Sequence, residues 1–84
     1  MKHTASSRFW KAYDTLPVNI RELADANFKL LKNDPNHPSL QFKRVGRFWS
    51  ARVGLRYRAL AVESDDSYVW FWIGSHADYD RLVG

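Results

Sequence analysis

The first part of the chain has the hydrophobic spacing of helices. Between residues 17 and 33, the positions that would face a core recur at intervals of three and four, which places them on one side of a helix. They are Ile20, Leu23, Ala24, Asn27, Phe28 and Leu31. Pro17 stands where the first helical turn tolerates proline, and two prolines follow residue 33. The sequence therefore predicts helices over 8–15 and 17–33, packed as an antiparallel pair.

After residue 40 the hydrophobic period becomes that of strands. Four runs rich in aromatic and β-branched residues predict strands, at Phe42–Val45, Phe48–Val53, Tyr57–Glu63 and Tyr68–Ile73. Short polar and glycine-containing spacers favour antiparallel neighbours joined by hairpins. Ser75 and Asp78 then have the spacing of a helix cap. We expect an α+β domain in which an N-terminal helical pair covers an antiparallel sheet of about four strands, with a short C-terminal helix.

The composition fits one small domain and excludes several kinds of site. The 84 residues contain no cysteine, which excludes disulfides and thiolate metal sites. The three histidines, at 3, 37 and 76, lack metal-ligand spacing, and no glycine-rich phosphate loop occurs. Neither an apolar run of about 20 residues nor a signal peptide is apparent. We expect a single domain over 1–84 that is cytoplasmic, does not enter a membrane, and uses no metal or small-molecule cofactor.

Positive charge is concentrated in the middle of the chain. The net charge is +4, yet the segment 35–62 carries six basic residues and no acidic one, which leaves seven basic and nine acidic residues elsewhere. A one-sided basic segment predicts a polyanion or an acidic protein as partner.

The basic residues of this segment fall on neighbouring predicted strands. Arg52, Arg56 and Arg58 flank the hairpin at Gly54, and Lys43 and Arg44 lie in the preceding strand. Guanidinium groups match the geometry of phosphate oxygens, so a convergent cluster would bind phosphate. The simpler interpretation is a solvated sheet face, or salt bridges to acidic residues near the N-terminus.

One histidine lies where it could add a proton-transfer group to the basic cluster. His76 follows the last predicted strand, and imidazole transfers protons near neutral pH. Tyr79 lies three residues later on the same helical face, where it could stack on a base or contact a phosphate. The simpler interpretations are a surface histidine near a helix cap and a tyrosine at the edge of the core.

Several short motifs, taken in order, resemble the RelE/ParE superfamily of type II toxin–antitoxin toxins. They are Leu16-Pro17 between the helices, Phe42-Lys43-Arg44-Val45, Trp49-Ser50-Ala51-Arg52-Val53-Gly54, Tyr57-Arg58-Ala59-Leu60, and Trp72-Ile73-Gly74-Ser75-His76-Ala77-Asp78-Tyr79. The resemblance covers nearly the whole chain. With a histidine, His76, at the position after the last strand, the sequence is similar to the RelE, YafQ and HigB-like branch of this superfamily.

This resemblance implies a curved sheet covered by two helices, with Lys2–Ala5 as a short first strand. It implies a metal-independent, ribosome-associated endoribonuclease that cleaves mRNA, inhibits translation and is neutralised by a cognate antitoxin. The reaction would be attack of a ribose 2′-hydroxyl on its own 3′-phosphate. The resemblance assigns catalysis to Arg52, Arg58 and His76, and substrate contacts to Lys43, Arg44, Arg56 and Tyr79.

Two other functions stay open at this point. A ParE-like inhibitor of DNA gyrase would bind a protein complex and would not need His76 for proton transfer. A catalytically silent RNA-binding module would keep the basic strands and would tolerate loss of that histidine.

Overall fold

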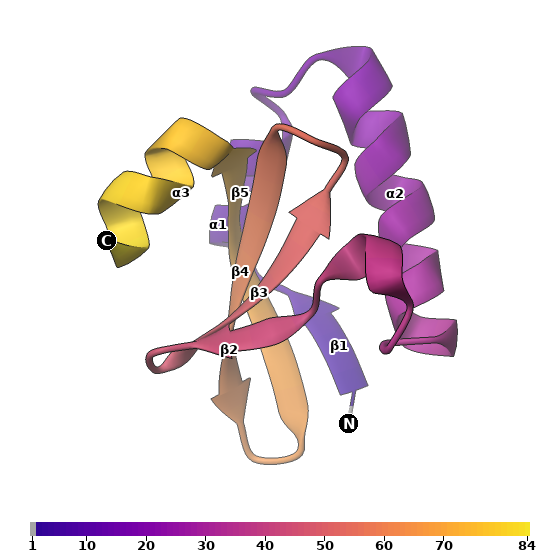
Figure 1. Ribbon diagram of the computed structural model, residues 1–84, viewed down its shortest axis with the longest axis vertical. Coiled ribbons are helices and arrows are strands. Elements are labelled where there is room, and N and C mark those ends of the chain that lie inside the picture. The colour runs from indigo at the N-terminus through magenta and orange to yellow at the C-terminus, as the bar shows by residue number, and fades with distance from the viewer. Residues whose placement is uncertain (1) are drawn as a thin grey trace.

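A computed structural model describes residues 2–84 and shows two N-terminal helices, a five-stranded sheet and a short C-terminal helix (Figure 1). The elements are β1 (Lys2–Ala5), α1 (Ser7–Tyr13), α2 (Val18–Asn33), the 3-10 helix η1 (Pro38–Leu40), β2 (Lys43–Val45), β3 (Phe48–Val53), β4 (Tyr57–Ser64), β5 (Ser67–Ser75) and α3 (His76–Val83). The α+β class is confirmed, and the predicted boundaries differ from these by at most two residues.

The sheet has the strand order β1-β5-β4-β3-β2. Each strand from β2 to β4 pairs antiparallel with the next strand along the chain, as the short spacers predict. Lys2–Ala5 adds a fifth strand, which pairs parallel with Ser67–Trp70 of β5. The upper half of β5 therefore has a neighbour on one side only, and this open edge lies beside α1 in Figure 1.

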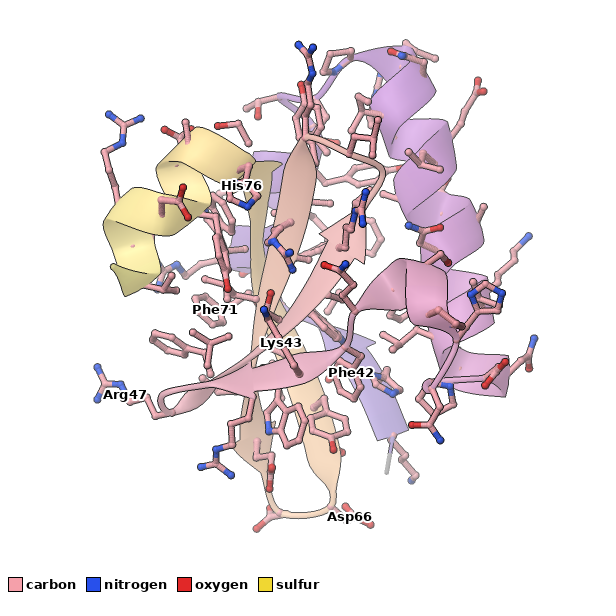
Figure 2. The ribbon with its side chains drawn as sticks, viewed as in Figure 1. Phe42, Lys43, Arg47, Asp66, Phe71 and His76 are labelled. Carbon is pink, nitrogen blue, oxygen red and sulfur yellow. The ribbon has the colours of Figure 1, made fainter. Side chains whose placement is uncertain are left out.

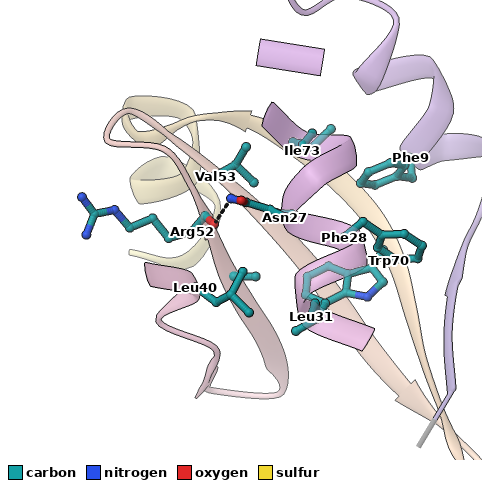
Figure 3. Close-up of a pocket in the computed structure, with 12 residues that line it drawn as sticks. Phe9, Asn27, Phe28, Leu31, Leu40, Arg52, Val53, Trp70 and Ile73 are labelled. Atoms are coloured by element: carbon teal, nitrogen blue, oxygen red, sulfur yellow. Dashed lines mark hydrogen bonds between the residues drawn. The ribbon is translucent and has the colours of Figure 1, made fainter. Parts of the chain in front are cut away.

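Both N-terminal helices, α1 and α2, bury their apolar sides against one face of the sheet. Ala24 and Leu31 of α2 pack in the core with Ala51 and Val53 of β3. Figure 3 shows α2 crossing this face, with the small apolar pocket between helix and sheet. α1 packs chiefly on β5 and meets α2 through a hydrogen bond that Tyr13 donates to Asp25, at 2.9 Å. The amphipathic pattern of 17–33 is thus confirmed.

The opposite face of the sheet carries α3. Because side chains alternate along a strand, Ser50 and Arg52 of β3 share this face with Arg58 and Leu60 of β4, their pairing partners. Ser75 caps α3, since its hydroxyl accepts a hydrogen bond from the amide of Asp78 at 3.2 Å, and the predicted cap is confirmed. The helix begins directly at the end of β5, so its first turn is fixed above the sheet.

No helix within residues 2–84 has the length and apolar character needed to cross a bilayer.

Candidate functional site

Arg58 lies at the centre of the face under α3. Its side chain extends from β4, and the residue is only 8% exposed. The guanidinium donates from Nη2 to Gln41 Oε1 at 2.9 Å and from Nη1 to Ser50 Oγ at 3.4 Å. On its other side, the ring of Tyr79 lies 5.2 Å from the guanidinium carbon, within the range of a cation–π interaction.

The charge of Arg58 is not neutralised by the protein. Within residues 2–84 no carboxylate lies at ion-pair distance from it, and its buried Nε has no hydrogen-bond partner. Buried arginines are normally paired, because removing a charge from water costs several kcal/mol. A guanidinium whose charge is not balanced by a carboxylate is therefore a candidate site for an anion.

Two more cations lie on the same face. Arg52 is the direct partner of Arg58 across β3 and β4, and side chains at directly opposed positions are close neighbours. Its Nε donates to the carbonyl of Gly54 at 2.8 Å, and Figure 3 shows its guanidinium pointing away from the core pocket. Lys43 pairs with Ser50 across β2 and β3, and in Figure 2 its side chain extends over the sheet.

His76 borders these cations from the start of α3, and its side chain is 48% exposed. Its amide donates to the carbonyl of Arg56 at 2.7 Å, which joins the helix to the β3–β4 turn. Its Nδ1 lies 3.2 Å from a carboxylate oxygen of Asp80, which leaves Nε2 available to a ligand. The ring also lies 5.7 Å from that of Tyr79.

These residues form one surface, which we call the arginine face. Its members come from four elements and are Lys43, Ser50, Arg52, Arg58, His76 and Tyr79. Figure 2 shows Lys43 and His76 on the same side of the sheet, at different heights along the strands. The arrangement supplies an electropositive surface for phosphate and one imidazole for proton transfer.

Arg44 and Arg56, the remaining two predicted substrate-binding residues, lie apart from this centre. Arg44 is on the other face of β2, where it bonds to the Gly46 carbonyl at 3.1 Å and lies 3.8 Å from Glu63. Arg56 lies exposed in the β3–β4 turn at the rim of the arginine face, and its backbone carbonyl holds His76.

Sequence reasoning missed Ser50 and Gln41, the two residues that hold the Arg58 guanidinium. Ser50 is fully buried, and its alternation with Arg52 along the predicted strand could have placed it on this face. Gln41 depends on a left-handed backbone conformation, φ 44°, just after η1. No motif in the sequence indicates that conformation.

The histidine with a shifted pKa lies away from the arginine face. Burial lowers the pKa of His3 below its usual value of 6.5, with smaller contributions from the N-terminal amine and Lys32. His3 accepts a hydrogen bond from Trp70 Nε1 at 3.1 Å and stacks on Tyr68 at 5.0 Å. Within residues 2–84 no three His, Asp or Glu side chains are grouped so that they could hold a metal ion.

Comparison with known proteins connects this geometry to a family. The model of the ParE-like toxin domain matches residues 18–81, which include every member of the arginine face. The chain belongs to this family of toxin domains. Its resemblance to the RelE/ParE superfamily is thereby confirmed. No curated protein matches the sequence.

Solved structures of toxins share the fold at low sequence identity. The RelB–RelE antitoxin–toxin complex from Methanococcus jannaschii aligns with a TM-score of 0.73 at 15% identity, over 96% of this chain and 99% of that one. YafQ from E. coli gives 0.73 at 14% identity, over 93% and 96%. The isolated E. coli RelE toxin gives 0.63 at 11% identity, over 96% and 94%.

Proposed function

We propose that this toxin is an endoribonuclease that cleaves mRNA on the ribosome and so inhibits translation. The observation that carries the proposal is the buried, unneutralised guanidinium of Arg58, which lies beside Arg52 and within reach of an imidazole-bearing helix. A guanidinium fork matches the geometry of phosphate oxygens, and phosphate is the anionic group that repeats along RNA. The superfamily to which the sequence is similar contains toxins with this activity.

The reaction would be transesterification within the RNA. The 2′-oxygen of one ribose attacks its own 3′-phosphorus, a new O2′–P bond forms and the P–O5′ bond breaks. One proton leaves the 2′-hydroxyl and one is added to the departing O5′, so the products carry a 2′,3′-cyclic phosphate and a 5′-hydroxyl. Negative charge grows on the non-bridging oxygens in the transition state, where fixed cations stabilise it.

The arginine face supplies the groups that this step needs. Arg58 and Arg52 would neutralise the phosphate oxygens, and Lys43 would bind the strand beside them. His76 Nε2 would transfer one of the two protons, while Asp80 holds the ring through Nδ1, at 3.2 Å. The ribosome would hold the RNA in line for attack, which a domain of 84 residues has little surface to do alone.

A cognate antitoxin is the expected protein partner. The M. jannaschii RelE neighbour was solved as a complex with RelB, and the same is true of RelE from Pyrococcus horikoshii. An acidic segment of an antitoxin would pair with the exposed cations of this toxin. By covering the arginine face, it would prevent phosphate from reaching Arg58.

The deciding experiment maps mRNA 5′ ends after brief induction of the toxin in growing cells. Wild type is compared with His76→Ala, and with Lys29→Ala as a control, since Lys29 is exposed on α2 away from the arginine face. The proposal predicts new 5′ ends within translated regions for wild type and the control, and none for His76→Ala.

The other outcomes would identify a different function. Intact mRNA together with growth arrest and DNA damage would indicate gyrase inhibition, which the ParE-like family assignment also accommodates. Intact mRNA without growth arrest would indicate a catalytically silent RNA-binding module. Either result would overturn the ribonuclease proposal.

A further inference from the structure

A pair of aromatic rings lies beside the arginine face. Phe48 of β3 and Phe71 of β5 are partly buried, with ring centroids 5.5 Å apart and planes inclined by 52°. Phe71 follows Trp70, which lies in the core, so alternation along β5 places Phe71 on the opposite face, to which Phe48 also points. Leu60 pairs with Trp72 and Ala61 with Trp70, so Phe71 has no partner on β4. A bulge of this kind leaves its extra residue outside the strand pairing.

Each of these rings lies under an arginine. The guanidinium carbon of Arg47 is 5.5 Å from the centre of the Phe48 ring, and that of Arg8 is 5.8 Å from the centre of the Phe71 ring. Neither arginine forms an ion pair with any residue from 2 to 84. We call these four residues, Phe48, Phe71, Arg8 and Arg47, the aromatic patch.

Phe48, Phe71 and Arg47 continue the arginine face along the sheet, whereas Arg8 reaches Phe71 from α1, which packs on the other face beside the open edge of β5. Phe48 and Ser50 are two residues apart on β3 and therefore point to the same side. Their positions are about 7 Å apart along the strand, which one nucleotide of an extended RNA can span. Figure 2 shows Phe71 and Arg47 on the side of the molecule that also bears Lys43 and His76.

We propose that the aromatic patch binds the base of a nucleotide adjacent to the phosphate held by Arg58, in a single-stranded RNA. The inference rests on the proposed ribonuclease function and adds a subsite to it. Unpaired bases stack on aromatic rings and on the planes of guanidinium groups, and arginines bind the flanking phosphates. An acidic protein segment would use the two positive charges and gain little from the rings. The combination therefore favours RNA.

The test measures binding of a fluorescein-labelled 2′-O-methyl RNA, which lacks the attacking hydroxyl and is not cleaved, to the full chain by fluorescence anisotropy at low salt. Phe71→Leu is expected to weaken binding about tenfold, whereas Phe71→Tyr keeps an aromatic ring and the affinity. The loss should shrink when the RNA contains abasic nucleotides in place of bases. Equal affinity of Phe71→Leu and wild type, or no binding by wild type, would overturn the proposal.

A surface variant tests the patch without touching packed rings. Arg47→Gln should lower the dependence of log affinity on log salt by about one phosphate contact, with Lys29→Gln on α2 as the matched control. An unchanged slope would contradict the proposal, and so would equal weakening of RNA and poly-glutamate binding by Phe71→Leu.

The two proposals can fail separately. If mRNA is cleaved in cells but Phe71→Leu binds RNA normally, the subsite is wrong and the nuclease stands. If Phe71→Leu weakens binding tenfold but wild type leaves cellular mRNA intact, the subsite stands and the nuclease is wrong.

Discussion

Replacing Arg58 with methionine should remove activity without destabilising the protein. Arg58 is only 8% exposed and lacks a carboxylate partner within residues 2–84, so its charge is costly to bury. The proposed function accounts for this cost, because it assigns the guanidinium to binding of the substrate phosphate. Methionine has a straight side chain that can follow the path of the arginine stem between Ser50 and Tyr79 without carrying a charge.

The magnitude follows from the contacts that Arg58 makes. Desolvation of an unpaired charge costs several kcal/mol. The hydrogen bond to Gln41, at 2.9 Å, returns about 1.5–3 kcal/mol, and the interaction with Tyr79 returns up to about 2 kcal/mol. The bond to Ser50 is long, at 3.4 Å, and adds little. We expect Arg58→Met to have a free energy of unfolding between that of wild type and about 2 kcal/mol above it.

Urea unfolding of both proteins, with thermal melts in low and high phosphate, provides the assay. Each kcal/mol corresponds to a shift in Tm of about 4–8 °C for a domain of this size. Phosphate should raise the Tm of wild type, since a ligand that binds only the folded state stabilises it, and should have less effect on Arg58→Met. A loss of more than about 1 kcal/mol in the variant would refute the reasoning and make Arg58 a structural residue.

Three further predictions concern stability. Because burial holds the pKa of His3 below 6.5, the folded state binds fewer protons at this residue than the unfolded chain does. The contribution of His3 to the free energy of unfolding is therefore fully present above pH 6.5 and is lost as the pH falls below that value. His3→Phe should show a smaller decrease between pH 7.5 and 5.5 in urea titrations, and equal decreases would contradict this. Gly46→Ala and Gly54→Ala should each cost about 1 kcal/mol, because both glycines have a positive φ and the exposed end of the Leu23 side chain, which a new Cβ at Gly54 would meet, can move aside. A clearly larger loss for Gly54→Ala on chemical denaturation would show that Leu23 is held in place. Ser75→Ala should lower the free energy of unfolding by about 1 kcal/mol through loss of the α3 cap, and an unchanged urea midpoint would show that the cap is dispensable.

Local patterns were sufficient to predict most of the fold. The spacing of apolar residues in α2 and the turn residues between the strands indicate which elements form, because both are properties of neighbouring positions. The parallel pairing of β1 with β5 joins residues more than 60 positions apart. In Lys2–Ala5, four residues without a hairpin, no local signal encodes that partner.

The candidate site was only partly predictable for a similar reason. Strand alternation and a hairpin were enough to place Arg52 beside Arg58. Whether Arg58 has a carboxylate partner depends on which acidic residues the fold brings near it, and that depends on tertiary packing. Arg44 shows the limit, since its neighbour Lys43 faces the site while Arg44 itself points to Glu63 on the other side.

The most direct test of the central claim uses translating ribosomes reconstituted with a defined mRNA. Wild type and Arg58→Met, the latter shown beforehand to be folded, are added separately, and the 5′ ends and end groups of the RNA are determined. We predict that wild type cuts the mRNA to leave 5′-hydroxyl ends and that Arg58→Met leaves it intact. Intact mRNA with wild type, or equal cleavage by both proteins, would contradict the account.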